Sequence, residues 1–202
     1  GTDSSGRLCF ADNTSSPQRG MIEYSHASDS MLFNANGSTR LKISSEGYVT
    51  QNNLPFLLGR GNDNTATRTL ANNNLFFNTA QGSQVAMSIT GSSSVTGGGS
   101  HGITYASGNG KFTVPVAGKY FIEGRLRYAS ATDAAVSVAI NTNGNNALAY
   151  VILQCTEATT LVVSGVANLA ANDFITFSNI SGGDRVFFNA DAHSGVSIFL
   201  IG

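Results

Sequence analysis

The chain has 202 residues, of which 41% are hydrophobic and only 11% are charged. This composition allows one sizeable domain with a smaller neighbour, and the 12 Phe and 6 Tyr argue against intrinsic disorder. A net charge of −1 without a basic stripe, and the lack of an apolar run of membrane-spanning length, argue against nucleic acid as a partner and against membrane insertion.

The first part of the chain, residues 1–50, alternates short apolar runs with turns, which predicts a β-rich connector module. The runs are Leu8–Phe10, Met21–Tyr24, Met31–Phe33 and Leu41–Ile43. Asn36-Gly37 predicts a tight turn, because both residues tolerate positive φ. Four short strands cannot bury a proper core alone. We therefore expect this part to be covered by identical copies of the chain, or to pack as an appendage on the domain that follows.

Several motifs of this part, in their order, resemble a module of bacteriophage tail-fibre and structural proteins. They are Gly6–Phe10, Gly20–His26, Asp29–Phe33, Arg40–Ile43 and Glu46–Val49. The resemblance implies a virion structural protein at the particle surface, with other virion proteins on its N-terminal side. Because the chain begins at Gly1 rather than Met, we expect it to be a fragment or a processed product.

The second part, residues 51–202, contains strand-like runs at a spacing that predicts a sandwich or jelly roll. The expected strands are Leu54–Leu58, Phe112–Val114, Lys119–Tyr128, Ala135–Ile140, Ala147–Leu153, Leu161–Ala167, Phe174–Phe177, Val186–Phe188 and Val196–Ile201. Asn143-Gly144 predicts a turn between two of them. Cys9 and Cys155 are too few for a disulfide scaffold, and we expect both thiols to be free.

Three segments of this part resemble motifs of the complement C1q/tumour-necrosis-factor family, namely Gly110–Ile122, Val166–Phe177 and Ser194–Ile201. The resemblance implies an all-β protein whose C-terminal jelly-roll β-sandwich forms a homotrimer, here preceded by a short β-hairpin shaft module. It also implies a set of residues at the centre of the family motif, which are Phe112, Pro115, Gly118, Tyr120 and Ile122. Of these, Phe112, Tyr120 and Ile122 have the spacing of side chains that face inward around a tight corner. In that family the last strand lies near the threefold axis.

Strand parity supports a partner surface independently of this resemblance. Side chains alternate between the two faces of a strand, so Phe121 cannot enter the same core as Tyr120 and Ile122. The last strand is apolar on both faces, which indicates burial on both faces. We therefore predict a trimer interface that contains Phe121, Phe199 and Ile201.

No constellation of residues predicts catalysis or a bound metal. Asp191, His193 and Ser194 are close in sequence, but triads gather from separate segments, so we interpret them as a polar loop. His26 and His101 lack metal-ligand spacing. Acidic residues expected in loops, which are Asp173, Asp184 and Asp191, give only a weak calcium signal. We predict no catalytic residue, no metal and no cofactor.

Tyr105, Tyr128 and Tyr150 either contribute to a glycan-binding or receptor-binding face, since sugars stack on aromatic rings, or are ordinary strand residues. The leading hypothesis is a trimeric phage fibre whose C-terminal head contacts a glycan or protein of the host surface. The alternative is a purely architectural head or capsid fibre, or a trimerisation cap. A glycan-degrading enzyme needs a carboxylate pair across a cleft, and no pair stands out.

Overall fold

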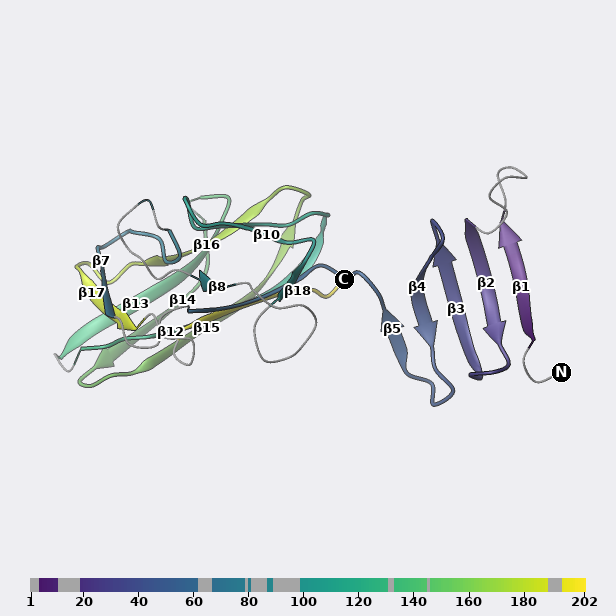
Figure 1. Cartoon of the computed structure of the whole chain (residues 1–202). Helices are drawn as coiled ribbons and strands as arrows, with labels where there is room; N and C mark the ends of the chain where they lie inside the picture. The colour runs from purple at the N-terminus through teal and green to yellow at the C-terminus, as the bar shows by residue number, and fades with distance from the viewer. Residues whose placement is uncertain are drawn as a thin grey trace. The chain divides into compact units, whose positions relative to one another are not determined.

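A computed structural model of the protein describes residues 4–10, 19–61, 67–78, 80, 87–88, 99–130, 133–144, 146–188 and 194–202. The chain divides into two compact units, Gly1–Leu54 and Pro55–Gly202, and each is described by itself (Figure 1). The regular structure of the described residues is β-strand in both units. No helix in this part of the chain is both long enough and apolar enough to cross a membrane.

The first unit is a five-stranded sheet in which each strand pairs antiparallel with the next one along the chain. Its strands are β1 (Ser5–Phe10), β2 (Gly20–Ser25), β3 (Ser30–Ala35), β4 (Ser38–Ile43) and β5 (Val49–Gln51). Asn36 and Gly37 join β3 to β4 with φ angles of 53° and 70°, which confirms the predicted tight turn. The three-residue strand β5 was not predicted.

This first sheet is a single layer of strands (Figure 1). Among its described residues, Met21 is the one hydrophobic residue that is buried. The described residues of this unit therefore enclose no core between two layers, as its short strands led us to expect.

The second unit contains two larger sheets and a small strand pair. The first sheet has the order β15–β12–β18–β6–β8, with β9 also beside β6, and the second has the order β10–β11–β16–β13–β14. The strands of the first sheet are β6 (Phe56–Gly61), β8 (Met87–Ser88), β9 (Gly99–His101), β12 (Gly118–Arg127), β15 (Thr160–Leu169) and β18 (Gly195–Leu200). Those of the second are β10 (Thr104–Ala106), β11 (Lys111–Thr113), β13 (Ala134–Thr142), β14 (Asn146–Cys155) and β16 (Phe174–Asn179). The pair consists of β7 (Thr67–Leu70) and β17 (Arg185–Phe188).

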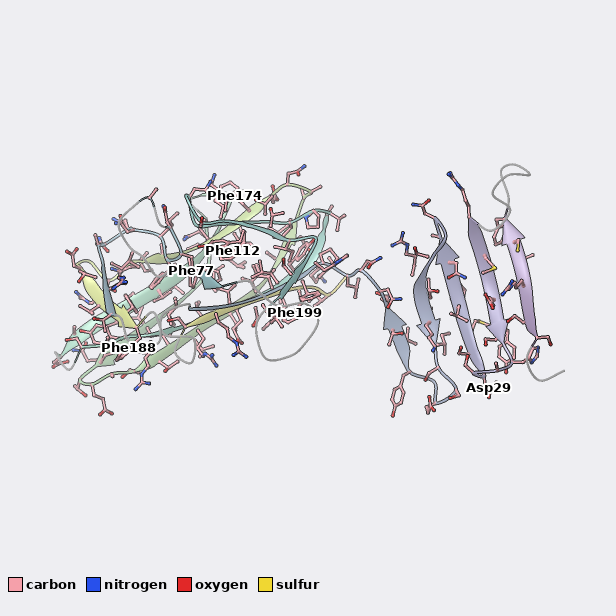
Figure 2. All side chains as sticks on the ribbon, viewed as in Figure 1. Asp29, Phe77, Phe112, Phe174, Phe188 and Phe199 are labelled. Carbon is pink, nitrogen blue, oxygen red and sulfur yellow. The ribbon has the colours of Figure 1, made fainter. Side chains whose placement is uncertain are left out.

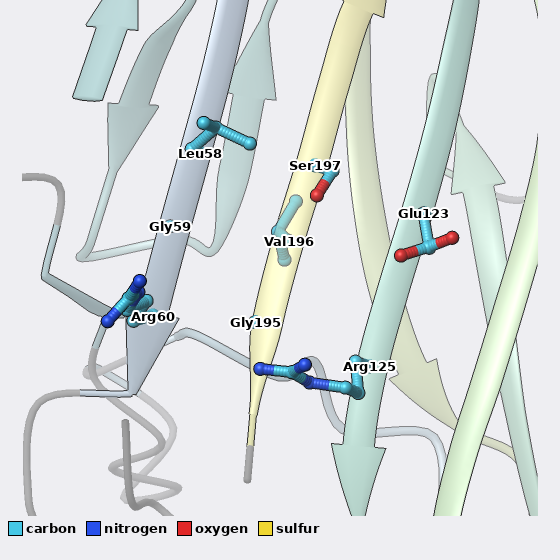
Figure 3. A pocket seen from close by; sticks show the side chains of 8 residues that line it. All are labelled: Leu58, Gly59, Arg60, Glu123, Arg125, Gly195, Val196 and Ser197. Atoms are coloured by element: carbon cyan, nitrogen blue, oxygen red, sulfur yellow. The ribbon is translucent and has the colours of Figure 1, made fainter. Parts of the chain in front are cut away.

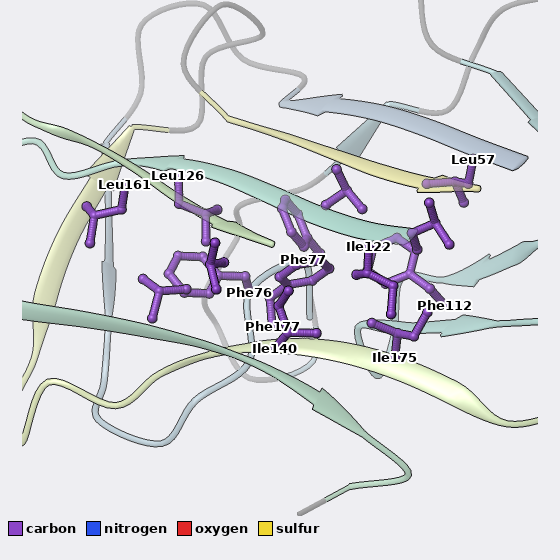
Figure 4. Packing of buried hydrophobic residues seen from close by; sticks show 14 of the residues in the cluster. Leu57, Phe76, Phe77, Phe112, Ile122, Leu126, Ile140, Leu161, Ile175 and Phe177 are labelled. Atoms are coloured by element: carbon purple, nitrogen blue, oxygen red, sulfur yellow. The ribbon is translucent and has the colours of Figure 1, made fainter. Parts of the chain in front are cut away.

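The core lies between the two sheets and is rich in aromatic rings (Figures 2 and 4). Phe112 on β11 and Phe177 on β16 meet edge to face, with ring centroids 5.9 Å apart. Phe77 packs edge to face against both, although it lies outside any strand. Such pairs stabilise a core beyond the area they bury. Cys155 is also buried and has a free thiol, whereas the free thiol of Cys9 is exposed.

The corner between β11 and β12 contains both buried and exposed residues of the family motif. Phe112, Tyr120 and Ile122 are fully buried, as their spacing predicts, whereas Pro115 is exposed. Pro115 lies on the loop between the strands, where its fixed φ shapes the turn and needs no burial. Position 118 favours glycine because there is no room for a side chain. A Cβ there would lie 2.5 Å from Leu200 Cδ1.

Candidate self-association surface

In the second unit, the β15–β12–β18–β6–β8 sheet has one face that points away from the core. This face carries a row of three phenylalanines. On β12 the side chains of Tyr120 and Ile122 enter the core, so Phe121 projects from the opposite face. Phe121 pairs with Phe199 on β18, and Phe199 pairs with Phe56 on β6. Residues paired across neighbouring strands point to the same face. The three rings are half-buried in the single chain and form what we call the Phe row (Phe199 is labelled in Figure 2).

The Phe row continues onto a fourth strand. Val166 on β15 pairs with Phe121 and is exposed, which extends the apolar surface to the edge of the sheet. Ile201 follows β18 directly and is 55% exposed. Of the residues predicted for a trimer interface, the structure therefore brings Phe121 and Phe199 together in one row and leaves Ile201 in water beside the sheet.

A small pocket of about 140 Å³ adjoins the Phe row on the same three strands (Figure 3). Leu58, Ser197 and Glu123 form the row next to the phenylalanines. In the row after that, Arg60 and Arg125 lie on either side of Gly195, whose missing side chain leaves the pocket open (Figure 3). The exposed face is thus apolar at one end and charged at the other.

Sequence reasoning missed the contributions of Phe56, Leu58 and Arg60 to this face. The apolar run Leu54–Leu58 was predicted as a strand, and period-two alternation would have placed Phe56 and Leu58 on one side of it. What the sequence did not reveal was that this strand pairs with β18. The long-range pairing is what makes one surface out of segments from both ends of the unit.

Two of the three tyrosines considered for glycan binding pack on the core. Tyr105 is half-buried and stacks on Phe112, with centroids 5.0 Å apart, and its hydroxyl donates to the carbonyl of Phe77 at 2.6 Å. Tyr128 is buried against Phe187. For these two residues the structure favours the alternative interpretation, in which the ring has a structural role. Tyr150 on β14 is 63% exposed.

The polar residues considered for catalysis or metal binding do not form a site in the described part of the chain. Ser194 is buried, and its hydroxyl donates to the carbonyl of Phe188 at 2.7 Å, whereas Asp191 and His193 lie outside the described residues. His101 is exposed, and His26 packs against the ring of Tyr24.

No group of three potential metal ligands occurs among the described residues. The carboxylate of Asp173 accepts a hydrogen bond from the Ala170 amide at 2.9 Å, so it closes a local turn. Asp184 is exposed in the loop before β17.

No protein-family model matches the sequence, and no curated protein matches it either. Among solved structures, the chain is similar to Eiger TNF from S. frugiperda, with 13% identity, 74% of this chain and 93% of that chain covered, and a TM-score of 0.56. It is also similar to the globular domain of zebrafish complement 1qA protein, with 15% identity, 73% and 98% coverage, and a TM-score of 0.47. The sandwich is a C1q/TNF-like jelly roll. The predicted fold class is confirmed, and at these identities the likeness concerns the fold.

Proposed function

We propose that three copies of the jelly-roll unit associate around a threefold axis through the Phe row and form the end of a trimeric fibre. The observation that carries this proposal is the pairing of Phe56, Phe199 and Phe121 on the outward face of a sandwich that already has a complete core. Completing the burial of a half-exposed Phe side chain contributes on the order of 1 kcal/mol, so a row of three favours association.

A cyclic trimer suits a surface of this kind. Each copy must present two different patches, and the ring closes when the rotation between copies is 120°. The resemblance to C1q/TNF-like domains supports this arrangement, because it implies a homotrimer with the terminal strand, here β18, near the axis. Phe199 belongs to this strand.

Sedimentation of the purified chain at micromolar concentration tests the trimer. We expect a mass three times that of the chain, and dissociation when Phe121→Asp or Phe199→Asp places a charge in the buried row. Ile180→Asp is the matched control, because Ile180 is an exposed hydrophobic residue in the turn after β16. A monomer in the unsubstituted protein removes the proposal.

The fibre end, in this proposal, belongs to a virion and contacts the host cell surface without catalysis. The resemblance of residues 1–50 to phage fibre modules supports the virion role. Tyr150 and Ile152 support the contact role, because both project from the outer face of the second sheet and are more than half exposed. The two outer faces of a sandwich point in opposite directions, so these side chains stay outside an assembly formed through the Phe row. Weak single contacts gain avidity from three copies.

Two assays test the contact role. One measures whether the fluorescently labelled trimer binds whole bacterial cells, and the other measures whether the trimer competes with phage adsorption. We expect Tyr150→Ala to weaken cell binding while leaving the sedimentation of the trimer unchanged. If the trimer binds no cells and does not compete, the receptor role is wrong, and the chain is an architectural head or capsid fibre or a trimerisation cap.

A further inference from the structure

The single-layer sheet of the first unit has one face that is almost entirely apolar. The strand register places one large apolar side chain from each of four strands in a central row, which consists of Leu8, Ile22, Phe33 and Leu41. A second row on the same face comes from β2 to β5 and consists of Tyr24, Met31, Ile43 and Val49. We call these two rows the apolar face of the first unit.

The opposite face of the same sheet carries the charges, together with the apolar side chains of Cys9, Met21 and Leu32. Arg7, Glu23 and Lys42 have the other strand parity, and a guanidinium nitrogen of Arg7 lies 3.2 Å from a carboxylate oxygen of Glu23. A charged face with a satisfied ion pair is suited to water. The two faces thus differ as the two sides of an amphipathic sheet do, which indicates that one side is meant to be covered.

The apolar face is as large as the largest apolar patches that single soluble chains usually leave in water. Strands spaced about 4.8 Å apart, with about 3.3 Å per residue, give the sheet a footprint of roughly 24 by 20 Å. Monomers rarely expose contiguous apolar patches larger than a few hundred Å². Within the chain, Leu8 remains 57% exposed and Val49 remains 59% exposed. This sheet is therefore incomplete without a second layer.

The chemistry of the face selects a copy of itself as that layer. The two rows contain no charged side chain, so a partner needs only apolar groups of matching shape, and each copy of the face supplies them. Gly6 at its margin leaves open space, because nothing lies within 4 Å of a Cβ there, and a large side chain of another copy can enter it.

The connection between the two units raises the local concentration of these copies. Only residues 52–55 separate the end of β5 from the start of β6. If three jelly rolls associate, each first unit is held near two others by a linker of this length. Short linkers of this kind give effective concentrations in the millimolar range.

We infer that the first units of three chains pack their apolar faces together into a three-sided prism whose interior holds the Leu8–Ile22–Phe33–Leu41 row. The number three rests on the proposed trimer of the jelly roll, whereas the covering of the face rests on the register of the first sheet alone. The polar faces with Arg7 and Glu23 form the outside of the prism.

Two neighbouring positions on the middle strand test this inference in the full chain. In a Cys9→Ser background, Met31→Cys places a thiol on the apolar face and Leu32→Cys places one on the opposite face. Met31 is exposed in the single chain, so its protection requires a covering layer. We expect a charged alkylating reagent to modify Met31→Cys roughly tenfold or more slowly than Leu32→Cys. Mild oxidation should link Met31→Cys chains in pairs, and Leu32→Cys chains should stay unlinked.

The same samples, run by sedimentation, separate this inference from the proposed function. A trimer in which both thiols react equally fast overturns the prism and leaves the jelly-roll trimer intact. A dimer overturns the number three. Protection of Met31→Cys in a sample that sediments as a monomer means that another part of the same chain covers the face, which also overturns the inference. The pair Leu8→Cys and Arg7→Cys repeats the test on the edge strand if the first pair folds poorly.

Discussion

The two units of this chain are built from strands of similar composition, but only one of them encloses a core. In the jelly roll, the long strands of the two sheets bury their facing sides against each other, so residues such as Phe112 and Phe177 lose all contact with water. In the first unit, Phe33 has the same alternation and remains half-buried, because the described residues of that unit form a single layer. Alternation of apolar and polar residues therefore specifies an apolar face. Whether a second layer covers that face decides how much it contributes to the free energy of unfolding.

The largest expected effect comes from removing a core ring in the jelly roll. Phe177→Ala should lower the free energy of unfolding by about 3–5 kcal/mol, because Phe177 is fully buried between two other aromatic rings. Phe33→Ala, measured at a dilution that separates the chains, should cost about 1 kcal/mol or less. Urea unfolding, monitored by hydrogen exchange of the amides in β16 and β3, measures the loss of stability in the two variants. Equal costs would mean that the first sheet has its own core.

A glycine sharpens the comparison at the contact between the two layers. A Cβ at Gly124 on β12 would lie 2.5 Å from the ring of Phe177 on β16, so this glycine lets the sheets approach. Gly124→Ala should destabilise the jelly roll by about 1–3 kcal/mol through overpacking. Gly108→Ala is the matched control, because nothing lies within 4 Å of a Cβ there. Thermal unfolding of both variants measures the difference, and a similar melting temperature for the two would contradict tight packing at Gly124.

Much of the jelly roll could be predicted from local sequence, and the limits of that prediction are physical. The strand Lys119–Tyr128 was predicted and corresponds to β12 (Gly118–Arg127), because period-two alternation is a local signal. Asn172 lies in the turn before β16 and has a φ of 72°, a conformation that Asn tolerates. Phe76 and Phe77 were missed, since they are buried by tertiary contacts and lie outside strands. Phe121 and Phe199 of the Phe row were predicted, because strand parity shows which face a side chain is on. Phe56 was missed, because only the long-range register shows which strands are neighbours.

A smaller effect concerns the hydroxyl of Tyr105. It donates to the carbonyl of Phe77, an irregular core residue with a φ of 62° that no strand pairing holds. Tyr105→Phe should therefore cost about 1 kcal/mol, the value typical of one hydrogen bond. Tyr150→Phe should leave stability unchanged, because the Tyr150 side chain is mostly in water. Chemical denaturation of the two variants tests this, and an unchanged stability for Tyr105→Phe would show that the hydroxyl is dispensable.

The smallest expected effect is a pH dependence confined to the polar face of the first sheet. A hydrogen bond from the Ser5 hydroxyl, and then the guanidinium of Arg7, hold the pKa of Glu23 below its ordinary value of 4.5. A carboxyl whose folded pKa is lowered stabilises the fold above that ordinary value, and the contribution disappears as pH falls through the lower one. Melting of the first unit between roughly pH 6 and pH 3 should therefore be less acid-sensitive in Glu23→Gln than in the unsubstituted chain. Glu157→Gln, in the jelly roll, should leave that profile unchanged. If Glu23→Gln also leaves the profile unchanged, the Glu23 carboxylate does not contribute to the stability of the first unit.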